Sequence, residues 1–464
     1  MSNISIHPSS LQGWTESPNS RGTIDIIYSC IFTIFICIWS VLCVNIAPSE
    51  ESAVAEYLQK LKLAFLCILG PDFLLLLAVG QFESARKSCR QFESLNLSRW
   101  SMRHAFYTDM GGFVVRTSEG VSWPLDANQL FYLIQHGWIE QPTLSSKILL
   151  NKSDLDDRNK QNTLVRLFSL AQILWFLVSC IARACQHLPV TTLELTTIGF
   201  IATTVGITIA WYQKPADVKT RQIIELNVSV AELHANAGLD GTYYWYDTPL
   251  DFLNSEKTYY GIAWRYCLNI LSKMFRRRSS QRPINRRPDD NFLPISRIGM
   301  VMVGIPGAIS WGANLAAWNL DFPTSIEKQM WRISSLILIA TVSAGGLYNE
   351  IIIHFFPNWR KEACDRFAVY HQRTTDLEST ASKDKFSEKV RRKKERVIFW
   401  LSNNSLNGDP SWSMELRVLL PALICGALYS LSRGYLLVED LIDFRGQNPE
   451  VYKDVDWGAF LPHV

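Results

Sequence analysis

The feature that most constrains the fold of this chain is a series of long apolar runs. A helix needs roughly 20 mostly apolar residues to cross the hydrocarbon core of a membrane. The sequence contains seven such runs, at residues 25–46, 63–80, 164–182, 195–212, 297–318, 333–355 and 418–438. We therefore predict an all-α, multi-pass transmembrane bundle of about seven spans, joined by long polar cytosolic loops.

The apolar runs divide the chain into alternating membrane and polar segments. Residues 1–23 lack the basic region and short apolar core of a cleaved secretory signal, so the first run is predicted to be a signal-anchor span. We expect a cytosolic N-terminal segment (1–24), spans one and two (25–80), a loop with an interfacial helix (81–163), spans three and four (164–212), an Arg-rich loop (213–296), spans five and six (297–355), a charged loop (356–417), span seven (418–438) and a luminal tail (439–464).

Basic residues are distributed unevenly about the seven predicted spans. The N-terminus and the three long loops carry 35 Lys and Arg residues, whereas the segments on the opposite side carry seven. Because cytosolic segments are enriched in Lys and Arg, we predict a cytosolic N-terminus and a C-terminus in the lumen or outside, with the endoplasmic reticulum as the expected membrane. On that topology no Asn-x-Ser/Thr sequon would be glycosylated. The five sequons are at Asn3, Asn96, Asn151, Asn227 and Asn403.

Two basic clusters lie in the predicted cytosolic loops, RRRSSQRPINRR (276–287) and KVRRKKER (389–396). Such clusters can indicate nucleic-acid binding. Beside membrane spans, attraction to the anionic lipid of the cytosolic leaflet explains them more simply. We therefore expect membrane lipids as partners and no nucleic acid.

Motifs for metal or cofactor chemistry are missing from the sequence. There is no GxGxxG, P-loop, HExxH or GxSxG, and no NDxxD or DDxxD pair lies in an apolar run. The acidic pairs in LDDR (155–158) and PDDN (288–291) fall in polar loops and are expected to be solvated. The ten cysteines show no CxxC or Cys/His spacing typical of zinc. We predict no metal and no cofactor, so any catalysis should be acid–base chemistry.

The second apolar run, ILGPDFLLLL (68–77), is interrupted by Pro71-Asp72. An ionisable residue at membrane depth costs at least about 2.5–3.5 kcal/mol and persists by facing the bundle interior. Proline removes a backbone donor and frees a carbonyl one turn earlier, which predicts a polar notch in the span. Burial favours a protonated carboxyl, so Asp72 is a candidate general acid. A purely structural role is the alternative.

Three other charged residues lie within or near the ends of predicted spans. Glu194 and Glu350, near the ends of spans four and six, are candidates to assist the acid or to accept the final proton. Arg433, in span seven, is the predicted partner of either Glu194 or Asp72. A structural ion pair is the competing interpretation.

The loop after span two contains HAFYTDMGGF (104–113), whose aromatic residues, Gly-Gly and Asp suit a segment packed against the bundle. His104 and Asp109 are candidates for substrate contact or for pairing within the fold. Ordinary loop polarity is the competing interpretation.

Several segments resemble those of a large family of fungal multi-pass membrane proteins. The quoted matches are GWTESPNSRGTIDIIYSCIFTIFICIWSVLCVNI, WSMRHAFYTDMGGF, LAQILWFLVSCIARACQHLPVTTLEL, WYQKPADV, AAWNLDFPTSIEKQMWR and VDWGAFLPHV. The resemblance is clearest over residues 13–46, 99–116, 164–216, 298–335 and 415–464. Some members lie near secondary-metabolite genes.

Members of this kind look similar to macrophorin-type membrane-bound terpene cyclases, which close a prenyl chain on an aromatic or polyketide head by protonating an alkene or epoxide. The resemblance implies a role in meroterpenoid biosynthesis with Asp72 as the acid. The chain departs from the family pattern at two positions. It has Asn314 where relatives carry His before the Ala-Trp of span five, and Asp72 where they favour Glu.

Three functions compete at this stage. The first is a terpene cyclase whose substrate, a lipid-soluble prenylated phenol or its epoxide, enters from the bilayer. The second is a proton-coupled transporter, which suits one intramembrane acid, although no internal repeat is visible. The third is a non-catalytic scaffold that tethers pathway enzymes through its basic loops.

Overall fold

The structure of the chain is a computed structural model. It describes residues 11–17, 21–139, 148, 163–216, 218–239, 243–253, 257–274, 282–355, 401, 403, 405 and 409–460. Asn3, Asn151, the KVRRKKER cluster and the Glu350 side chain lie outside the described residues, so the expectations about them stay predictions.

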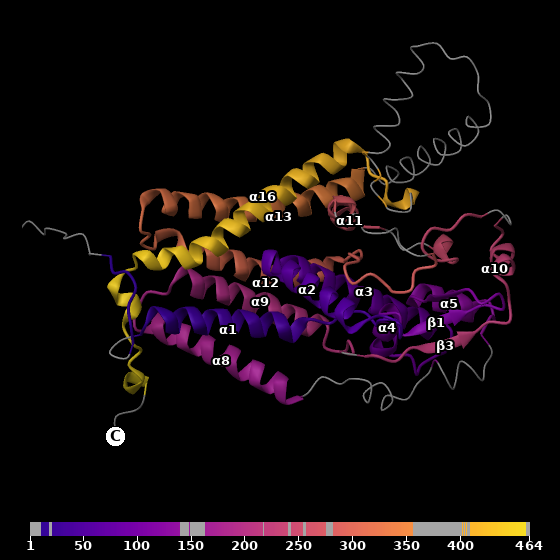
Figure 1. The fold of residues 1–464 in the computed structure, drawn as a ribbon, viewed down its shortest axis with the longest axis horizontal. Coiled ribbons are helices and arrows are strands. Elements are labelled where there is room, and N and C mark those ends of the chain that lie inside the picture. Colours follow the sequence, from indigo (N-terminus) through magenta and orange to yellow (C-terminus); the bar gives the residue numbers. More distant parts are fainter. Residues whose placement is uncertain are drawn as a thin grey trace, which may run out of the picture.

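Among the described residues, six helices are long and apolar enough to cross a membrane. They are α1 (Thr23–Val41), α8 (Thr163–Cys185), α9 (Thr192–Ala210), α12 (Arg297–Ala316), α13 (Ser325–Phe355) and α16 (Leu416–Ile442). These helices run side by side along the long axis of the molecule, with α9 packed against α1 and α12 (Figure 1). The predicted all-α multi-pass bundle is confirmed.

The second predicted span differs from the expected continuous helix over 63–80. The chain forms α2 (Ala53–Leu69) and α3 (Pro71–Ser94), which meet at an angle of 117°. Gly70 joins them in a conformation (φ −157°, ψ 84°) outside the helical region. Pro71 is the first residue of α3, where its missing N–H would have no helical acceptor. The proline therefore begins a new helix instead of notching a continuous one.

Both helices of the α2–α3 pair lie against one segment, residues 286–296. Glu51, just before α2, pairs with Arg286 at 2.9 Å. Halfway along α3, Ser296 donates a hydrogen bond to Glu83 at 2.6 Å. The start of α2 and the middle of α3 therefore lie beside the same segment, the arrangement expected of a re-entrant element.

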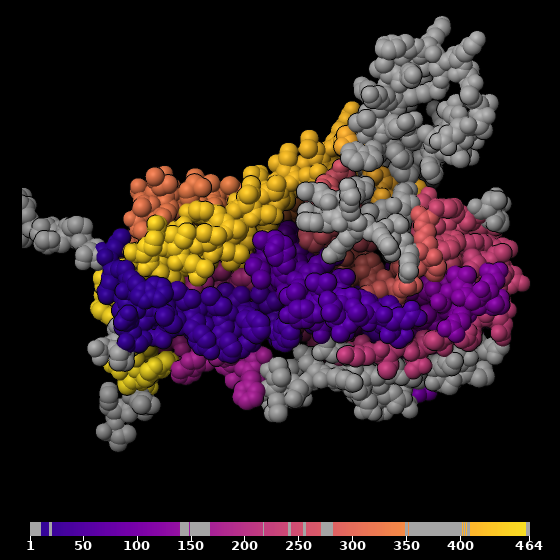
Figure 2. Space-filling model, in the orientation of Figure 1, coloured from indigo at the N-terminus to yellow at the C-terminus, as the bar shows by residue number. Residues whose placement is uncertain are grey.

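The two chain termini lie at one end of the bundle, here called the termini end (residues 11–22 and 443–460). Gln12 bridges to Gln447, and the Arg21 N–H donates to the Tyr452 carbonyl at 3.0 Å. In Figure 2 the indigo N-terminal and yellow C-terminal residues meet on the left. The predicted placement of these two segments on opposite sides is wrong, because they contact each other at one end of the bundle.

The opposite end, here called the polar end, gathers loops that are distant in sequence. It contains α4 (Met102–Asp109), α5 (Ala127–Gln135), α10 (Val230–Asn236), α11 (Tyr259–Met274) and the segment 282–296. A three-stranded sheet, absent from our prediction, has the order β2 (Ser122–Pro124), β1 (Phe113–Arg116), β3 (Gln222–Glu225). Strand β1 pairs antiparallel with β2 and parallel with β3, so the loops after α3 and α9 form one layer.

Short 3-10 helices complete the described structure: η2 (Asp251–Leu253), η3 (Ala317–Asn319), η4 (Pro410–Trp412), η5 (Asp443–Arg445), η6 (Pro449–Tyr452) and η7 (Trp457–Phe460). The expected interfacial helix of the 81–163 loop is the second half of α3, which extends to Ser94.

Candidate functional site

Asp72 lies in the first turn of α3, immediately after the break at Gly70. Its side chain is buried, and the Trp311 indole N–H donates to its Oδ2 at 3.0 Å. The Tyr429 hydroxyl lies beside the same carboxyl. Trp311 is in the third quarter of α12 and Tyr429 is at the middle of α16, so Asp72 sits well inside the bundle. The predicted interior position of Asp72 is confirmed.

The second oxygen of Asp72, Oδ1, has no hydrogen-bond partner among the described residues. The backbone of Gly307 packs closely on this side, since a Cβ added there would lie 3.7 Å from Oδ1 and 3.2 Å from the Trp311 ring. Trp311 thus anchors one oxygen of Asp72, and the Tyr429 hydroxyl is the nearby group that also acts on this carboxyl.

Arg433 lies one turn after Tyr429 on the same buried face of α16. Its guanidinium lies 5.1 Å from the centre of the Phe200 ring, and it is close enough to act electrostatically on both Asp72 and Asp440. Within the described part of the chain, its Nε and Nη2 find no hydrogen-bond acceptor. Arg433 is therefore next to Asp72, one of its two predicted partners.

Asn314 is buried on α12, three residues beyond Trp311. Its backbone carbonyl accepts a hydrogen bond from the Trp331 indole at 3.0 Å, whereas its side-chain Oδ1 has no partner among the described residues. The Phe73 ring packs edge-on against Tyr429 with centroids 4.9 Å apart. The interior around Asp72 therefore combines incompletely bonded polar groups with aromatic rings. We call this set, Asp72, Trp311, Asn314, Tyr429 and Arg433, the buried polar cluster.

Glu194 does not belong to this cluster. It lies in the first turn of α9 at the termini end and forms an ion pair with Arg21. Its other oxygen accepts hydrogen bonds from the N–H and hydroxyl of Thr191, at 2.8 and 3.0 Å. The predicted alternative pairing of Arg433 with Glu194 is wrong, because a nearer arginine and the helix N-terminus already bind this carboxylate.

Glu350 lies near the end of α13, and its side chain is outside the described residues. The backbone places it close to the polar end, since Tyr260 of α11 donates to the Gly345 carbonyl at 3.1 Å. His104 has a local structural role: its Nδ1 contacts the Ser101 hydroxyl at 2.8 Å and its ring stacks on Trp100 at 5.4 Å. It caps α4.

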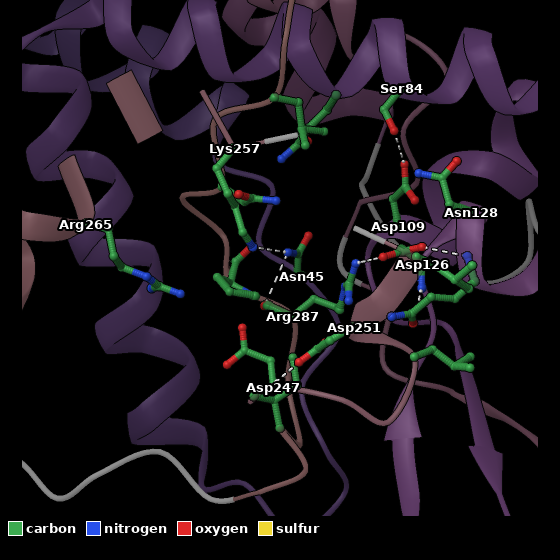
Figure 3. Close-up of a pocket in the computed structure, with 18 of the residues that line it drawn as sticks. Asn45, Ser84, Asp109, Asp126, Asn128, Asp247, Asp251, Lys257, Arg265 and Arg287 are labelled. Carbon is green, nitrogen blue, oxygen red and sulfur yellow. Dashed lines mark hydrogen bonds and ion pairs between the residues drawn. The ribbon is translucent and has the colours of Figure 1, made fainter. Parts of the chain in front are cut away.

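A second candidate site is a cavity of about 110 Å³ at the polar end, between the middle of α3, α5 and residues 247–293 (Figure 3). Its acidic lining residues are Asp109, Asp126, Asp247 and Asp251. Its cationic lining residues are Lys257, Arg265 and Arg287. We call it the polar-end cavity. Asp109 is the one predicted site residue that lines it.

The two carboxylates from α4 and α5 are held differently in the polar-end cavity. Asp126 forms an ion pair with Arg287 and caps α5 by accepting the Gln129 N–H at 2.8 Å. Asp109 accepts the Ser84 hydroxyl at 3.0 Å and the Ala127 N–H at 2.9 Å. Burial, reinforced by the Asp126 charge, raises the pKa of Asp109 from 3.8 to about 6. Asp109 therefore exchanges its proton close to neutral pH.

The acidic pair of PDDN, expected to be solvated, is buried beside this cavity. Asp290 pairs with Lys62 at 2.8 Å and accepts the Trp264 indole N–H at 2.9 Å, and Asp289 pairs with Arg286 at 3.3 Å. The polar-end cavity could not be predicted from the sequence, because its walls come from loops separated by more than a hundred residues. Among the described residues, no group of three or more His, Cys, Asp or Glu side chains could hold a metal ion.

Comparison with known proteins gives one match. A family model described as a family of unknown function, DUF8562, matches residues 1–233, slightly more than half of the chain. No curated protein and no solved structure matches this chain.

Proposed function

The chain belongs to the DUF8562 family, whose function is unknown, and we propose that it is a membrane-embedded terpene cyclase. Its substrate would be a lipid-soluble prenylated phenol or the corresponding epoxide. One observation carries the proposal: Asp72 has one oxygen anchored by Trp311 and the other unpartnered among the described residues, inside an aromatic-lined bundle. The proposed substrate would meet this carboxyl in the interior of the bundle.

Charge balance in the buried polar cluster supports an acidic Asp72. The Arg433 guanidinium acts on two carboxyl groups, Asp72 and Asp440. Inside a membrane bundle one cation balances one carboxylate, and a second ionised carboxylate would be costly. One of these two carboxyls is therefore favoured in its protonated form, and we propose that it is Asp72.

The reaction would begin with transfer of the Asp72 proton to the terminal alkene carbon or the epoxide oxygen. The electron pair of a neighbouring double bond then attacks the resulting cationic carbon and closes a ring. Loss of a proton from the final cation returns Asp72 to its acid form, so no proton is consumed. The ring faces of Phe73 and Tyr429 would stabilise the positive charge during closure.

The topology that we propose follows from the even number of crossings. Segments at the polar end, with the loop that joins α13 to α16, carry 36 Lys and Arg residues, and those at the termini end carry six. The positive-inside rule then puts the polar end in the cytosol and both termini in the lumen. We retain the endoplasmic reticulum as the proposed membrane.

The test compares membranes that contain wild type, Asp72→Asn or Glu119→Gln, each supplied with a prenylated phenol and its epoxide. Asp72→Asn keeps the size of the side chain and removes its acidic proton. We expect it to lower the rate of cyclisation about 10²–10⁴-fold, the usual contribution of a positioned general acid. Glu119, exposed in the turn after β1, is the control and should leave the rate unchanged. Equal product from wild type and Asp72→Asn would remove Asp72 from the mechanism.

A proton-coupled carrier is the second candidate, and the break between α2 and α3 favours it. Discontinuous helices whose ends meet inside the bundle form the substrate sites of many transporters. Here the N-terminus of α3 and the Asp72 carboxyl meet at such a break. Proteoliposomes separate the two candidates. A carrier accumulates unchanged substrate in response to a pH gradient, whereas a cyclase converts it without a gradient.

A further inference from the structure

We propose that a cavity at the termini end binds the headgroup of a zwitterionic, ammonium-bearing phospholipid. The cavity measures about 420 Å³ and lies between α1, α8 and residues 454–457. We call it the termini-end cavity. Helices α1 and α8 run side by side, and the yellow C-terminal segment lies beside their ends at the left of Figure 1. The buried polar cluster lies on α3, α12 and α16 instead, so the inference does not depend on the proposed cyclase activity.

The charged lining of the termini-end cavity has more carboxylates than cations. It consists of Arg21, Asp25, Arg183, Glu194 and Asp454. Arg21 pairs with Glu194, and Asp454 acts electrostatically on Arg183. Two of the three carboxylates therefore have a cation beside them. The excess of one negative charge favours a cationic group in the cavity and disfavours a free anion.

Asp25 carries that excess charge. Its hydrogen bonds come from neutral groups, the Gly22 N–H at 3.0 Å and the Ser17 hydroxyl. Among the described residues it forms no ion pair. The side chain is exposed in the first turn of α1, at the rim of the cavity. An ammonium group that entered there would meet an unpaired carboxylate.

Aromatic rings form the wall on the α8 side. Trp175 stacks on Trp457 of η7 with the ring centroids 5.5 Å apart, and the two residues are 60% and 42% exposed. The Gln186 side-chain amide bonds both the N–H and the carbonyl of Asp456, at 3.0 and 2.7 Å, and so holds η7 beside the end of α8. The face of a tryptophan ring attracts ammonium groups, and proteins recognise choline in this way.

The arginine at the end of α8 fixes the same wall. The buried Arg183 guanidinium donates to the carbonyls of Pro189, Val451 and Lys453 at 2.8–3.2 Å. These bonds tie the C-terminal segment to the α8–α9 turn. Arg183 is therefore a structural group of the cavity, and the segment that carries Trp457 is held in position by the fold.

Arg21 supplies a second point of recognition. Its Nη2 pairs with Glu194, whereas its Nη1 is buried and has no hydrogen-bond partner among the described residues. Because the Arg21 charge is already balanced, Nη1 needs an acceptor oxygen more than it needs a second counter-ion. A phospholipid carries phosphate oxygens a few bonds from its ammonium nitrogen. A zwitterionic headgroup thus offers a cation to Asp25 and an acceptor to Arg21 without adding net charge.

The surroundings of the cavity favour a lipid over a soluble ammonium compound. Ile24 and Tyr28 of α1 and Ile181 of α8 point outward and are 61–66% exposed. In a membrane-spanning bundle such residues contact acyl chains. The cavity volume suits a headgroup and is too small for a whole phospholipid, so the chains would lie along these outer faces.

The experiment measures lipid binding to the purified full-length protein. Delipidated protein in detergent is mixed with phosphatidylcholine, phosphatidylethanolamine or phosphatidylglycerol of the same chain composition, and bound lipid is counted by native mass spectrometry. Phosphatidylglycerol has the phosphate and the chains but lacks the ammonium group. The test variants are Asp25→Asn, which keeps an acceptor for the Gly22 N–H, Trp457→Leu, and the conservative Trp457→Phe.

Two matched controls accompany these variants. Glu16→Gln removes one negative charge from an exposed position at the same end of the bundle, outside the cavity lining. Trp39→Leu removes a 47% exposed tryptophan from α1, also outside the lining. Both should bind the three lipids as wild type does.

We expect phosphatidylcholine or phosphatidylethanolamine to bind saturably and at least tenfold more tightly than phosphatidylglycerol. Asp25→Asn and Trp457→Leu should each remove most of that preference, and Trp457→Phe should restore part of it. If Asp25→Asn does not fold, the two Trp457 variants decide the matter. Equal binding of all three lipids, a preference that survives in both Asp25→Asn and Trp457→Leu, or an equal loss in Trp39→Leu would each overturn the proposal.

Discussion

Arg21 and Glu194 form a buried ion pair that joins the segment before α1 to the first turn of α9. The pair closes the termini end of the bundle, where Gln12 also meets Gln447. These contacts hold the segment before α1 against α9 and against the segment after α16. The segments before α1 and after α16 therefore lie at the same end of the bundle.

Breaking this ion pair should destabilise the protein. Glu194→Gln leaves the Arg21 charge without its partner in a poorly solvated position, and loss of one member of a buried pair costs about 3–5 kcal/mol. Thermal unfolding in detergent would measure the effect. The double variant Arg21→Met, Glu194→Gln should recover part of the loss, because no charge is stranded. Full additivity of the two single variants would show that the pair does not couple.

The topology predicts glycosylation at a single sequon. Asn3 lies nine residues before Gln12, which bridges to Gln447 at the termini end. In the proposed topology the termini end faces the lumen. We now expect a glycan on Asn3, in place of the earlier expectation of none, because the N-terminus shares a side with the C-terminal tail. The measurement is an endoglycosidase-sensitive shift in gel mobility that Asn3→Gln abolishes.

The other four sequons provide the internal control for that measurement. Asn96 and Asn227 belong to the polar end, and Asn151 and Asn403 lie in segments that join it. A glycan on any of these four would place the polar end in the lumen and reverse the assignment.

A glycine on α3 should be intolerant of any side chain. A Cβ at Gly80 would lie 3.0 Å from the carbonyl oxygen of Leu293 and 3.3 Å from its nitrogen, and backbone atoms cannot rotate away. Gly80→Ala should therefore lower stability by about 1–3 kcal/mol through overpacking. Gly304→Ala on α12 is the matched control, since nothing lies within 4 Å of its added Cβ. It should be neutral or stabilise by up to about 1 kcal/mol. Equal unfolding temperatures for the two variants would contradict the close contact.

Asp109 should make stability depend on pH between about 4 and 6. Its pKa is 3.8 when exposed and about 6 in the fold, so the folded protein binds the proton more tightly than the unfolded chain. The resulting stabilisation is complete below pH 3.8 and is lost as the pH rises through 6, by up to about 3 kcal/mol.

Asp109→Asn should remove that dependence. Relative to wild type, its unfolding temperature should rise with increasing pH up to about 6 and then stay level. Glu119→Gln controls for the general loss of one negative charge. A difference between Asp109→Asn and wild type that is constant from pH 4 to pH 8 would mean that Asp109 titrates normally.

The positions of the membrane helices and the interior location of Asp72 could be predicted from the sequence. Both follow from local physics: about twenty apolar residues must be helical in lipid, and a carboxyl among them must face the protein. The sequence left both Asp72 and Glu194 open as neighbours of Arg433 and could not decide between them. The choice depends on which helix faces pack together. It also depends on Arg21, which precedes α1 in the sequence and lies beside the first turn of α9 in the fold.

Sequence alone therefore determined that this chain is an all-α membrane bundle with an acid in its interior, because hydropathy acts residue by residue. Only the tertiary structure decided the number of crossings and the existence of the polar-end cavity. Pro71 is equally compatible with a kinked span and with the start of a new helix. The contacts of Glu51 and Glu83 with residues 286–296 select the second, because they hold the start of α2 and the middle of α3 against the same segment.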